Sequence, residues 1–278
     1  MFIVAVEQFT PAEQRLVHDR IARQFLPVTA QLTLAACRLP LVRHQLMRWS
    51  DQRLPGLWGG LLCRKRYGDD QFALALNQGI RQIVSLGAGL DTRPYRYLAK
   101  ALGRTFEIDL PANSAYKQRR LRAIFGRVPE HVVLIPLDFE AADISSSLDT
   151  HGYLAEAPTL FVWEAVSQYL TEAGIRRTLA FLAEAAHGSR LIFTYVQRDF
   201  IDGANLFGCQ ALYDQFLGKD RMWHFGLRPL EVPPLLAEFG WSEREQVGRA
   251  QYLRRYVQPL GRRLSVTDVE RFVLAEKP

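Results

Sequence analysis

Short apolar runs rich in β-branched residues recur along the chain after residue 80, separated by stretches with helical spacing or turn residues. Runs of this length and composition indicate strands of a buried sheet. Because strands and helical stretches alternate, the pattern predicts an α/β fold with a mostly parallel sheet. The last two runs look like a closing antiparallel pair. The predicted strands span residues 83–86, 105–110, 132–137, 159–163, 189–196, 241–248 and 269–276.

The first 60 residues have a different pattern, in which apolar side chains recur at helical spacing. A Thr-Pro-Ala-Glu start signal at 10–13 predicts a helix, and Pro27 divides it into two segments. We interpret residues 1–60 as a helical extension or lid of a single domain that spans 1–278. The predicted helices cover residues 10–36 and 40–49. After a turn at 54–60, residues 61–70 lead into a further helix, which runs through Phe72 and ends at Asn77.

A glycine turn follows the first strand. Gly87 and Gly89 carry no Cβ, so the backbone can turn tightly and approach a ligand closely. A dinucleotide fold would need a third glycine three positions later, where the chain has Thr92. This departure disfavours a dinucleotide oxidoreductase and favours an adenosine ligand without a pyrophosphate. For the motif alone, an ordinary strand-to-helix turn remains the alternative.

Acidic side chains follow three further predicted strands. Asp109 ends the second strand about 20 residues after the glycine turn, where a carboxylate can bind the two ribose hydroxyls of an adenosine or cap the next helix. Asp138 and Phe139 follow the third strand, where they can contact the amine and the face of adenine. Glu164 follows the fourth strand. Because parallel strands end at one edge of the sheet, these side chains are expected to meet there.

Composition narrows the function classes. The chain has 278 residues, a formal charge of +6, and 48% hydrophobic and 23% charged residues, as in globular proteins. Its 3 cysteines are far apart, which excludes a disulfide framework and predicts a reducing, cytoplasmic setting without a metal site. No stretch suggests a leader or membrane insertion. Basic clusters, the longest at 117–122, are interpreted as solvated helix faces rather than as a nucleic-acid surface.

Several motifs resemble the leucine carboxyl methyltransferase family, in particular its shorter bacterial O-methyltransferases, from about residue 11 onwards. The most specific is Gly-Ala-Gly-Leu-Asp-Thr-Arg at 87–93, and the others are Arg64 with Asp69-Asp70, residues 106–111, 136–139 and 161–171, and tail matches at 225–227, 252, 255–256 and 270–271. The resemblance implies a class I methyltransferase fold, with a Rossmann-like seven-stranded sheet, an N-terminal helical cover and S-adenosylmethionine as cofactor.

The resemblance also implies roles for individual residues. Arg64 would pair with the methionyl carboxylate and Glu164 with the methionyl ammonium, as their charges allow. Lys65 departs from the bacterial pattern, which usually has Thr there, and Arg66 lies close enough to leave the carboxylate partner open between Arg64 and Arg66. The implied cofactor-binding residues are Arg64, Gly87, Ala88, Gly89, Asp109, Leu110, Asp138, Phe139, Glu164 and Ala165.

The methyl acceptor is expected to be a small molecule, in keeping with secondary metabolism. An ionised carboxylate needs no general base, and no histidine lies near the motif ends, so the sequence favours a carboxylate or an already acidic hydroxyl. Arg64 and Tyr169 are the candidates for a clamp on it, and Tyr169 is the candidate catalytic residue. A nucleic-acid methyltransferase and a non-catalytic cofactor-binding module are the alternatives. Against the first, this chain lacks the Asn/Asp-Pro-Pro-aromatic motif for amino methylation. Against the second, the expected cofactor ligands Asp109, Asp138 and Glu164 are all present.

Overall fold

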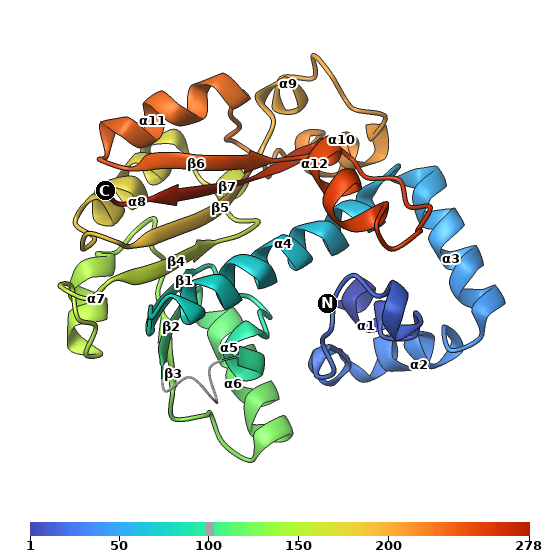
Figure 1. Cartoon of the computed structure of the whole chain (residues 1–278), viewed down its shortest axis with the longest axis horizontal. Coiled ribbons are helices and arrows are strands. Elements are labelled where there is room, and N and C mark those ends of the chain that lie inside the picture. Colours follow the sequence, from blue (N-terminus) through green and yellow to red (C-terminus); the bar gives the residue numbers. More distant parts are fainter. Residues whose placement is uncertain (98–102) are drawn as a thin grey trace.

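A seven-stranded sheet forms the centre of the structure, a computed structural model that describes residues 1–97 and 103–278 (Figure 1). The strand order is β3-β2-β1-β4-β5-β7-β6. Strands β1 to β5 are parallel, and β7 runs antiparallel to both β5 and β6. The mostly parallel sheet and its closing antiparallel pair are thus confirmed. The strands are β1 (Gln82–Leu86), β2 (Arg104–Asp109), β3 (Val132–Pro136), β4 (Thr159–Trp163), β5 (Arg190–Val196), β6 (Ser242–Val247) and β7 (Glu270–Glu276).

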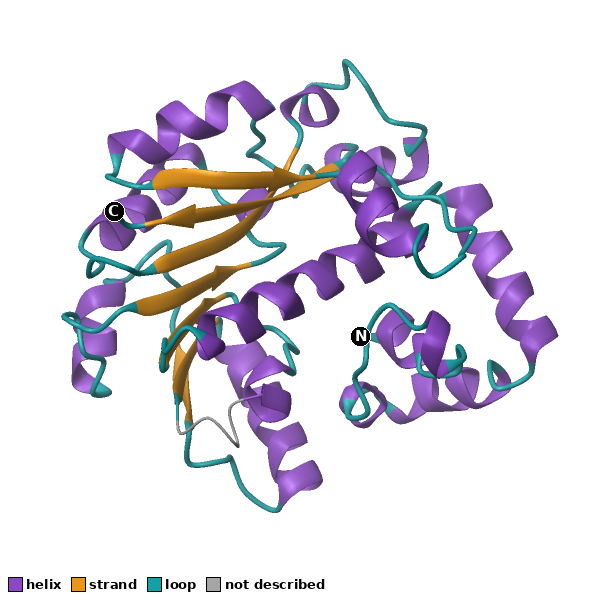
Figure 2. Cartoon of the chain, in the orientation of Figure 1, coloured by secondary structure: helices purple, strands orange, loops and turns teal. Residues whose placement is uncertain are grey.

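Helices cover both faces of the sheet (Figure 2). Successive strand residues point to opposite faces, so they build two separate cores. On one face Ile83 and Leu160 pack in a core with α4 and the N-terminal region. On the other, Val84 and Phe161 pack in a core with α7, α8 and α11. The helices that follow the N-terminal region are α4 (Leu57–Asn77), α5 (Arg93–Tyr97), α6 (Pro111–Phe125), α7 (Ile144–Thr150), α8 (Glu172–Ala183), α9 (Arg198–Ile201), α10 (Gln210–Leu217), α11 (Val232–Glu238) and α12 (Arg249–Tyr252).

The N-terminal region is helical but not as predicted. It consists of α1 (Phe2–Glu7), two 3₁₀ turns (Ala12–Gln14 and Ala22–Phe25), α2 (Val28–Ala36) and α3 (Pro40–Arg53). The single helical stretch expected from residue 10 up to Pro27 is wrong, because side chains bind the amides that such a helix would use. The Glu7 carboxylate accepts from the Leu16 amide at 2.8 Å, and Asp19 accepts from the Ala22 amide at 2.9 Å. In Figure 1 these helices lie beyond α4, away from the strands.

Two further local predictions need correction. The turn expected over residues 54–60 ends at Gly56 and α4 starts at Leu57, so residues 61–70, which were expected only to lead into the helix, are themselves helical. The basic cluster at 117–122 is not wholly a solvated face, because Lys117 is buried and its Nζ lies 2.7 Å from Glu107 Oε1. No helix among the described residues combines the length and the apolarity needed to cross a membrane.

Candidate active site

A cavity of about 380 Å³, here called the central cavity, lies at the carboxyl ends of β1 and β4 and against α4. Its floor is the glycine turn, where Gly87 adopts a φ of +70° and Gly89 a φ of +44°. A Cβ on Gly87 would lie 2.4 Å from Val166 Cγ2, so only glycine fits between the two strand ends. Of the predicted cofactor residues, Arg64, Gly87, Ala88, Gly89, Glu164 and Ala165 line this cavity.

Charges of both signs face the central cavity. Arg64 donates from Nε to Glu164 Oε1 at 2.9 Å, and Lys65 Nζ lies 3.6 Å from Asp91 and 3.7 Å from Glu164. Burial alone would raise the pKa of the Glu164 carboxyl, but the cations of Arg93, Lys65 and Arg64 lower it to about 2. Glu164 is therefore ionised at neutral pH. Two cations and two anions on one wall match a ligand that carries both an ammonium and a carboxylate.

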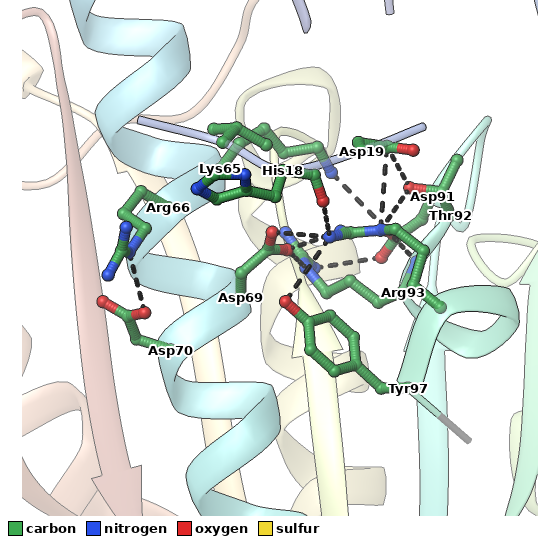
Figure 3. A network of polar contacts seen from close by, with 12 residues as sticks. His18, Asp19, Lys65, Arg66, Asp69, Asp70, Asp91, Thr92, Arg93 and Tyr97 are labelled. Carbon is green, nitrogen blue, oxygen red and sulfur yellow. Dashed lines mark hydrogen bonds and ion pairs between the residues drawn. The ribbon is translucent and has the colours of Figure 1, made fainter. Parts of the chain in front are cut away.

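Arg64 and Arg66, the two candidates for a carboxylate partner, point in different directions. Arg64 is largely buried and lines the central cavity. Arg66 pairs with Asp70 at 2.9 Å, is 37% exposed, and in Figure 3 points toward Asp70 and away from Asp91. Lys65, which the sequence showed only as a departure from the family pattern, is the second cation of the cavity wall. The geometry therefore favours Arg64, with Lys65, for binding an anion there.

A buried ion network joins Arg93 to carboxylates of this wall, and Figure 3 shows Arg93 beside Asp69 and Asp91. The Arg93 side chain is fully buried and pairs with Asp69 at 3.1 Å, with Asp91 at 3.0 Å and with Glu164. Helix α4 makes room for it at Gly68, where a Cβ would lie 2.6 Å from Arg93 Nη2. Because the guanidinium forks between three carboxylates, it fixes where Glu164 stands.

The predicted adenosine residues lie at the neighbouring strand ends. Asp109 ends β2 as expected, and its Oδ2 accepts from the Gly89 amide at 2.5 Å while Oδ1 accepts from the Leu110 amide at 2.8 Å. The Asp109 carboxylate thus couples the glycine turn to the start of α6. Asp138 is exposed and accepts from the Glu140 amide at 3.0 Å, and Phe139 is buried in the core beside α8. Neither of these two residues lines the central cavity.

A second cavity of about 230 Å³, here called the aromatic cavity, adjoins the first. Arg64 and Ala165 line both. Ala165 adopts a φ of +62°, which is costly for a residue with a Cβ and is typical of functional sites. Tyr169 lines the aromatic cavity with 43% of its surface exposed, and its ring meets that of Trp223 edge-on at 6.2 Å between centroids.

Other walls of the aromatic cavity come from the tail of the chain. Glu270, at the start of β7, accepts from Arg64 Nη1 at 2.6 Å, and Tyr252 of α12 is buried beside them. Among the aromatic side chains between residues 197 and 220, Phe216 lines the cavity and stacks on Trp223 at 4.4 Å between centroids, whereas Phe200 is part of a buried core. The sequence pointed to Tyr252 and Glu270 only as matches in the tail, and it gave no signal for Trp223.

The sequence profile of the leucine carboxyl methyltransferase family matches residues 1–183. The chain belongs to this family. A relative from Mycolicibacterium paratuberculosis, named "Putative S-adenosyl-L-methionine-dependent methyltransferase", is 28% identical over 244 residues, which are 86% of this chain and 75% of the relative. A protein of the same name from Mycobacterium avium is 30% identical over 252 residues, which are 86% of this chain and 82% of that protein. This leucine carboxyl methyltransferase family member is therefore an S-adenosylmethionine-dependent methyltransferase.

Solved structures support the fold of this family member. A methyltransferase structure from Thermobifida fusca superposes with a TM-score of 0.62 at 17% identity, covering 96% of this chain and 98% of the other. A DUF574 family protein from Streptomyces avermitilis superposes with a TM-score of 0.61 at 16% identity, covering 92% of this chain and 97% of that protein. At these identities the similarity shows the fold alone. The class I methyltransferase architecture implied by the sequence motifs is thus confirmed.

Proposed function

We propose that this enzyme transfers a methyl group from S-adenosylmethionine to an oxygen atom of a small molecule bound in the aromatic cavity. The observation that carries the proposal is the shared wall: Arg64 and Ala165 line both the central cavity and a smaller, largely apolar cavity beside it. A concave apolar site next to a cofactor site is typical of small-molecule binding. A role in secondary metabolism and a cytoplasmic location remain predictions from the sequence.

The residues of the central cavity fit the methionyl part of S-adenosylmethionine. Arg64 and Lys65 would hold its carboxylate, and Glu164 with Asp91 would hold its ammonium. Ala88 and Gly89 would lie against the adenosine. For the remainder of the adenosine we propose the strand-end roles that the family resemblance implies, with Asp109 and Leu110 at the ribose and Asp138 and Phe139 at adenine. Because the Asp109 carboxylate already accepts from Gly89, ribose binding would extend an existing hydrogen-bond network.

The chain's main contribution to the reaction is positioning. When bound, S-adenosylmethionine supplies an electrophilic methyl group, so the protein needs to align an acceptor oxygen with it and exclude water. Ala165 and Arg64, at the junction of the two cavities, would fix that alignment, and Tyr169 is proposed to contact the acceptor from the outer wall. Whether the oxygen belongs to a carboxylate, as the lack of a nearby histidine favours, or to a hydroxyl depends on the charges that face the aromatic cavity.

The experiment has two parts. Calorimetric titration of S-adenosylhomocysteine into wild type and Asp109→Ala tests the cofactor side, and a charge-assisted hydrogen bond of about 1.5–3 kcal/mol predicts binding weakened by at least about tenfold in the variant. Transfer from S-adenosylmethionine tritiated in its methyl group tests the acceptor side. Label that partitions into organic solvent from a mixture of small aromatic acids and phenols supports the proposal. Label that enters only added RNA or protein would refute it.

A further inference from the structure

The aromatic cavity contains one carboxylate among the described residues that line it. Glu270 reaches it from the start of β7, and the side chain is only 20% exposed. Its Oε2 accepts from Arg64 Nη1 at 2.6 Å, whereas its Oε1 is buried and has no hydrogen-bond partner among the described residues. A buried carboxylate oxygen without a donor is costly, so a rotation of the Glu270 carboxyl that brings Oε1 to the cavity surface would gain a hydrogen bond from a ligand.

Glu270 also lies where a reaction would occur. Its partner Arg64 is one of two residues that line both cavities, so the Glu270 carboxyl is anchored to the wall between them. A general base must lie within hydrogen-bond reach of the proton that it removes, and the acceptor oxygen has to stand at this same junction to meet the methyl group.

These charges do not favour a carboxylate acceptor. Arg64 already donates from Nε to Glu164 and from Nη1 to Glu270, so two of its three nitrogens serve carboxylates of the protein. A ligand carboxylate in the aromatic cavity would face Glu270, and two buried like charges at close range repel each other. A hydroxyl has a proton to donate to Oε1 and adds no charge.

The rest of the cavity fits an aromatic hydroxyl compound. Trp223, Phe216 and Tyr252 supply aromatic walls, and about 230 Å³ exceeds the roughly 150 Å³ cavity that takes a benzene. Two more buried polar atoms here, Gln168 Oε1 and Trp223 Nε1, lack hydrogen-bond partners among the described residues. A ring with a second polar substituent could use one of them. Burial, and then the charge of Glu270, raise the pKa of the Tyr252 hydroxyl, so Tyr252 stays protonated and is not a base.

We propose that Glu270 is the catalytic base of this methyltransferase and that its acceptor is a small phenolic compound. The proposal rests on the proposed function and specifies its substrate. The acceptor hydroxyl donates to Glu270 Oε1, and its oxygen forms a bond to the methyl carbon as the carbon–sulfur bond breaks. Sulfur keeps the electron pair of that bond, the proton moves to Oε1, and it is later released to water. The products are an aryl methyl ether, S-adenosylhomocysteine and one proton.

The test compares Glu270→Gln with a matched control, Glu276→Gln. Both residues lie on β7 and both pair with arginines, but Glu276 binds Arg190 and Arg244 at the far end of the strand and does not line the aromatic cavity. Each protein is assayed for tritiated methyl transfer to phenol, 2-naphthol, 4-nitrophenol and benzoate, and for binding of S-adenosylhomocysteine. Mild base separates the products, because it hydrolyses methyl esters and leaves aryl methyl ethers intact.

Wild type and Glu276→Gln are expected to give base-stable label from the phenols and none from benzoate. Glu270→Gln should bind S-adenosylhomocysteine like wild type and lose about 10²–10⁴-fold in rate on phenol and 2-naphthol. Its loss on 4-nitrophenol should be much smaller, because that more acidic hydroxyl ionises without help. A merely structural role for Glu270 would lower all rates equally.

Three results would overturn the proposal. They are base-labile label from benzoate, an equal loss on all phenols in Glu270→Gln, and no product from any phenol by a wild type that binds S-adenosylhomocysteine. A wild type that does not bind S-adenosylhomocysteine would instead refute the proposed function itself, so the two failures are distinguishable.

Discussion

The buried guanidinium of Arg93 is expected to be the largest single electrostatic contribution to stability near the site. Replacing it with methionine keeps much of the volume of the side chain but removes the charge that faces Asp69, Asp91 and Glu164. Removing one partner of a buried ion pair costs about 3–5 kcal/mol, because the remaining charge stays buried without compensation. Asp69 still pairs with Arg96, Asp91 with Lys65 and Glu164 with Arg64, so we expect a loss within that range rather than three times as large.

This loss in the free energy of unfolding predicts a measurable fall in the melting temperature. For a domain of this size about 1 kcal/mol moves the melting temperature by roughly 2–4 °C, so Arg93→Met should melt about 6–20 °C below wild type. Thermal and urea unfolding followed by circular dichroism measure it. The matched control is Arg176→Met, since Arg176 pairs with Glu238 at 2.8 Å but both side chains are about half exposed. Exposed pairs contribute about 0–1 kcal/mol, so the control should melt close to wild type.

The comparison is decisive because both variants remove one arginine from an ion pair and differ mainly in burial. If Arg93→Met and Arg176→Met lose the same free energy of unfolding, the buried network is not what holds this part of the fold together. Arg93→Lys separates charge from geometry. A single ammonium cannot fork between three carboxylates as a guanidinium does, so this variant should fall between Arg93→Met and wild type.

Glu164, Gly68 and Gly87, in or next to the central cavity, provide three further tests. The pKa of the Glu164 carboxyl is about 2 in the folded protein against the usual 4.5, so the unfolded chain binds this proton more tightly. The ionised carboxylate therefore stabilises the fold by about 3 kcal/mol at neutral pH. Urea unfolding should show that this contribution is constant between pH 6 and 8 and is lost as the pH falls from about 4.5 to 2. Gly68→Ala should lower the free energy of unfolding by about 1–3 kcal/mol in the same assay, since its Cβ would displace Arg93 and overpacking outweighs the helix propensity that alanine gains. Gly87→Ala should weaken S-adenosylhomocysteine binding by at least about tenfold in calorimetry, because its φ of +70° and the contact with Val166 force the turn to move; unchanged affinity would show that the turn does not touch the cofactor.

The strands were predictable because their signal is local. An apolar run at residues 159–163 is buried on both faces wherever it lies in the sheet, and the structure has β4 at those residues. The N-terminal region was not predictable in the same way. Its apolar spacing is helical, but the Glu7 and Asp19 carboxylates bind amides that are 3 to 9 residues away in sequence and stop a continuous helix. Such contacts leave no period in the sequence.

In the candidate site, too, residues with a local sequence signal were predictable and residues brought together from distant segments were not. Gly87 and Glu164 were predictable because each follows a strand, and strand ends in a parallel sheet share one edge. The aromatic cavity was not, because its walls come together only in three dimensions. Arg64 and Glu270 are 206 residues apart in sequence and yet bonded, and nothing near residue 270 indicates that a helix from the first quarter of the chain will meet it.

The most specific motif of the sequence, residues 87–93, both lines the central cavity, through residues 87–91, and positions other groups, through Thr92 and Arg93. In the segment that follows Gly89, Thr92 donates to Asp19 at 2.5 Å and so ties the N-terminal region to the turn, and Arg93 holds Glu164 in place. In this segment Leu90 and Asp91 line the central cavity, whereas Thr92 and Arg93 do not. The turn therefore connects the N-terminal region, the charged wall and the glycine floor of the central cavity, so one short segment fixes how these three parts stand relative to one another.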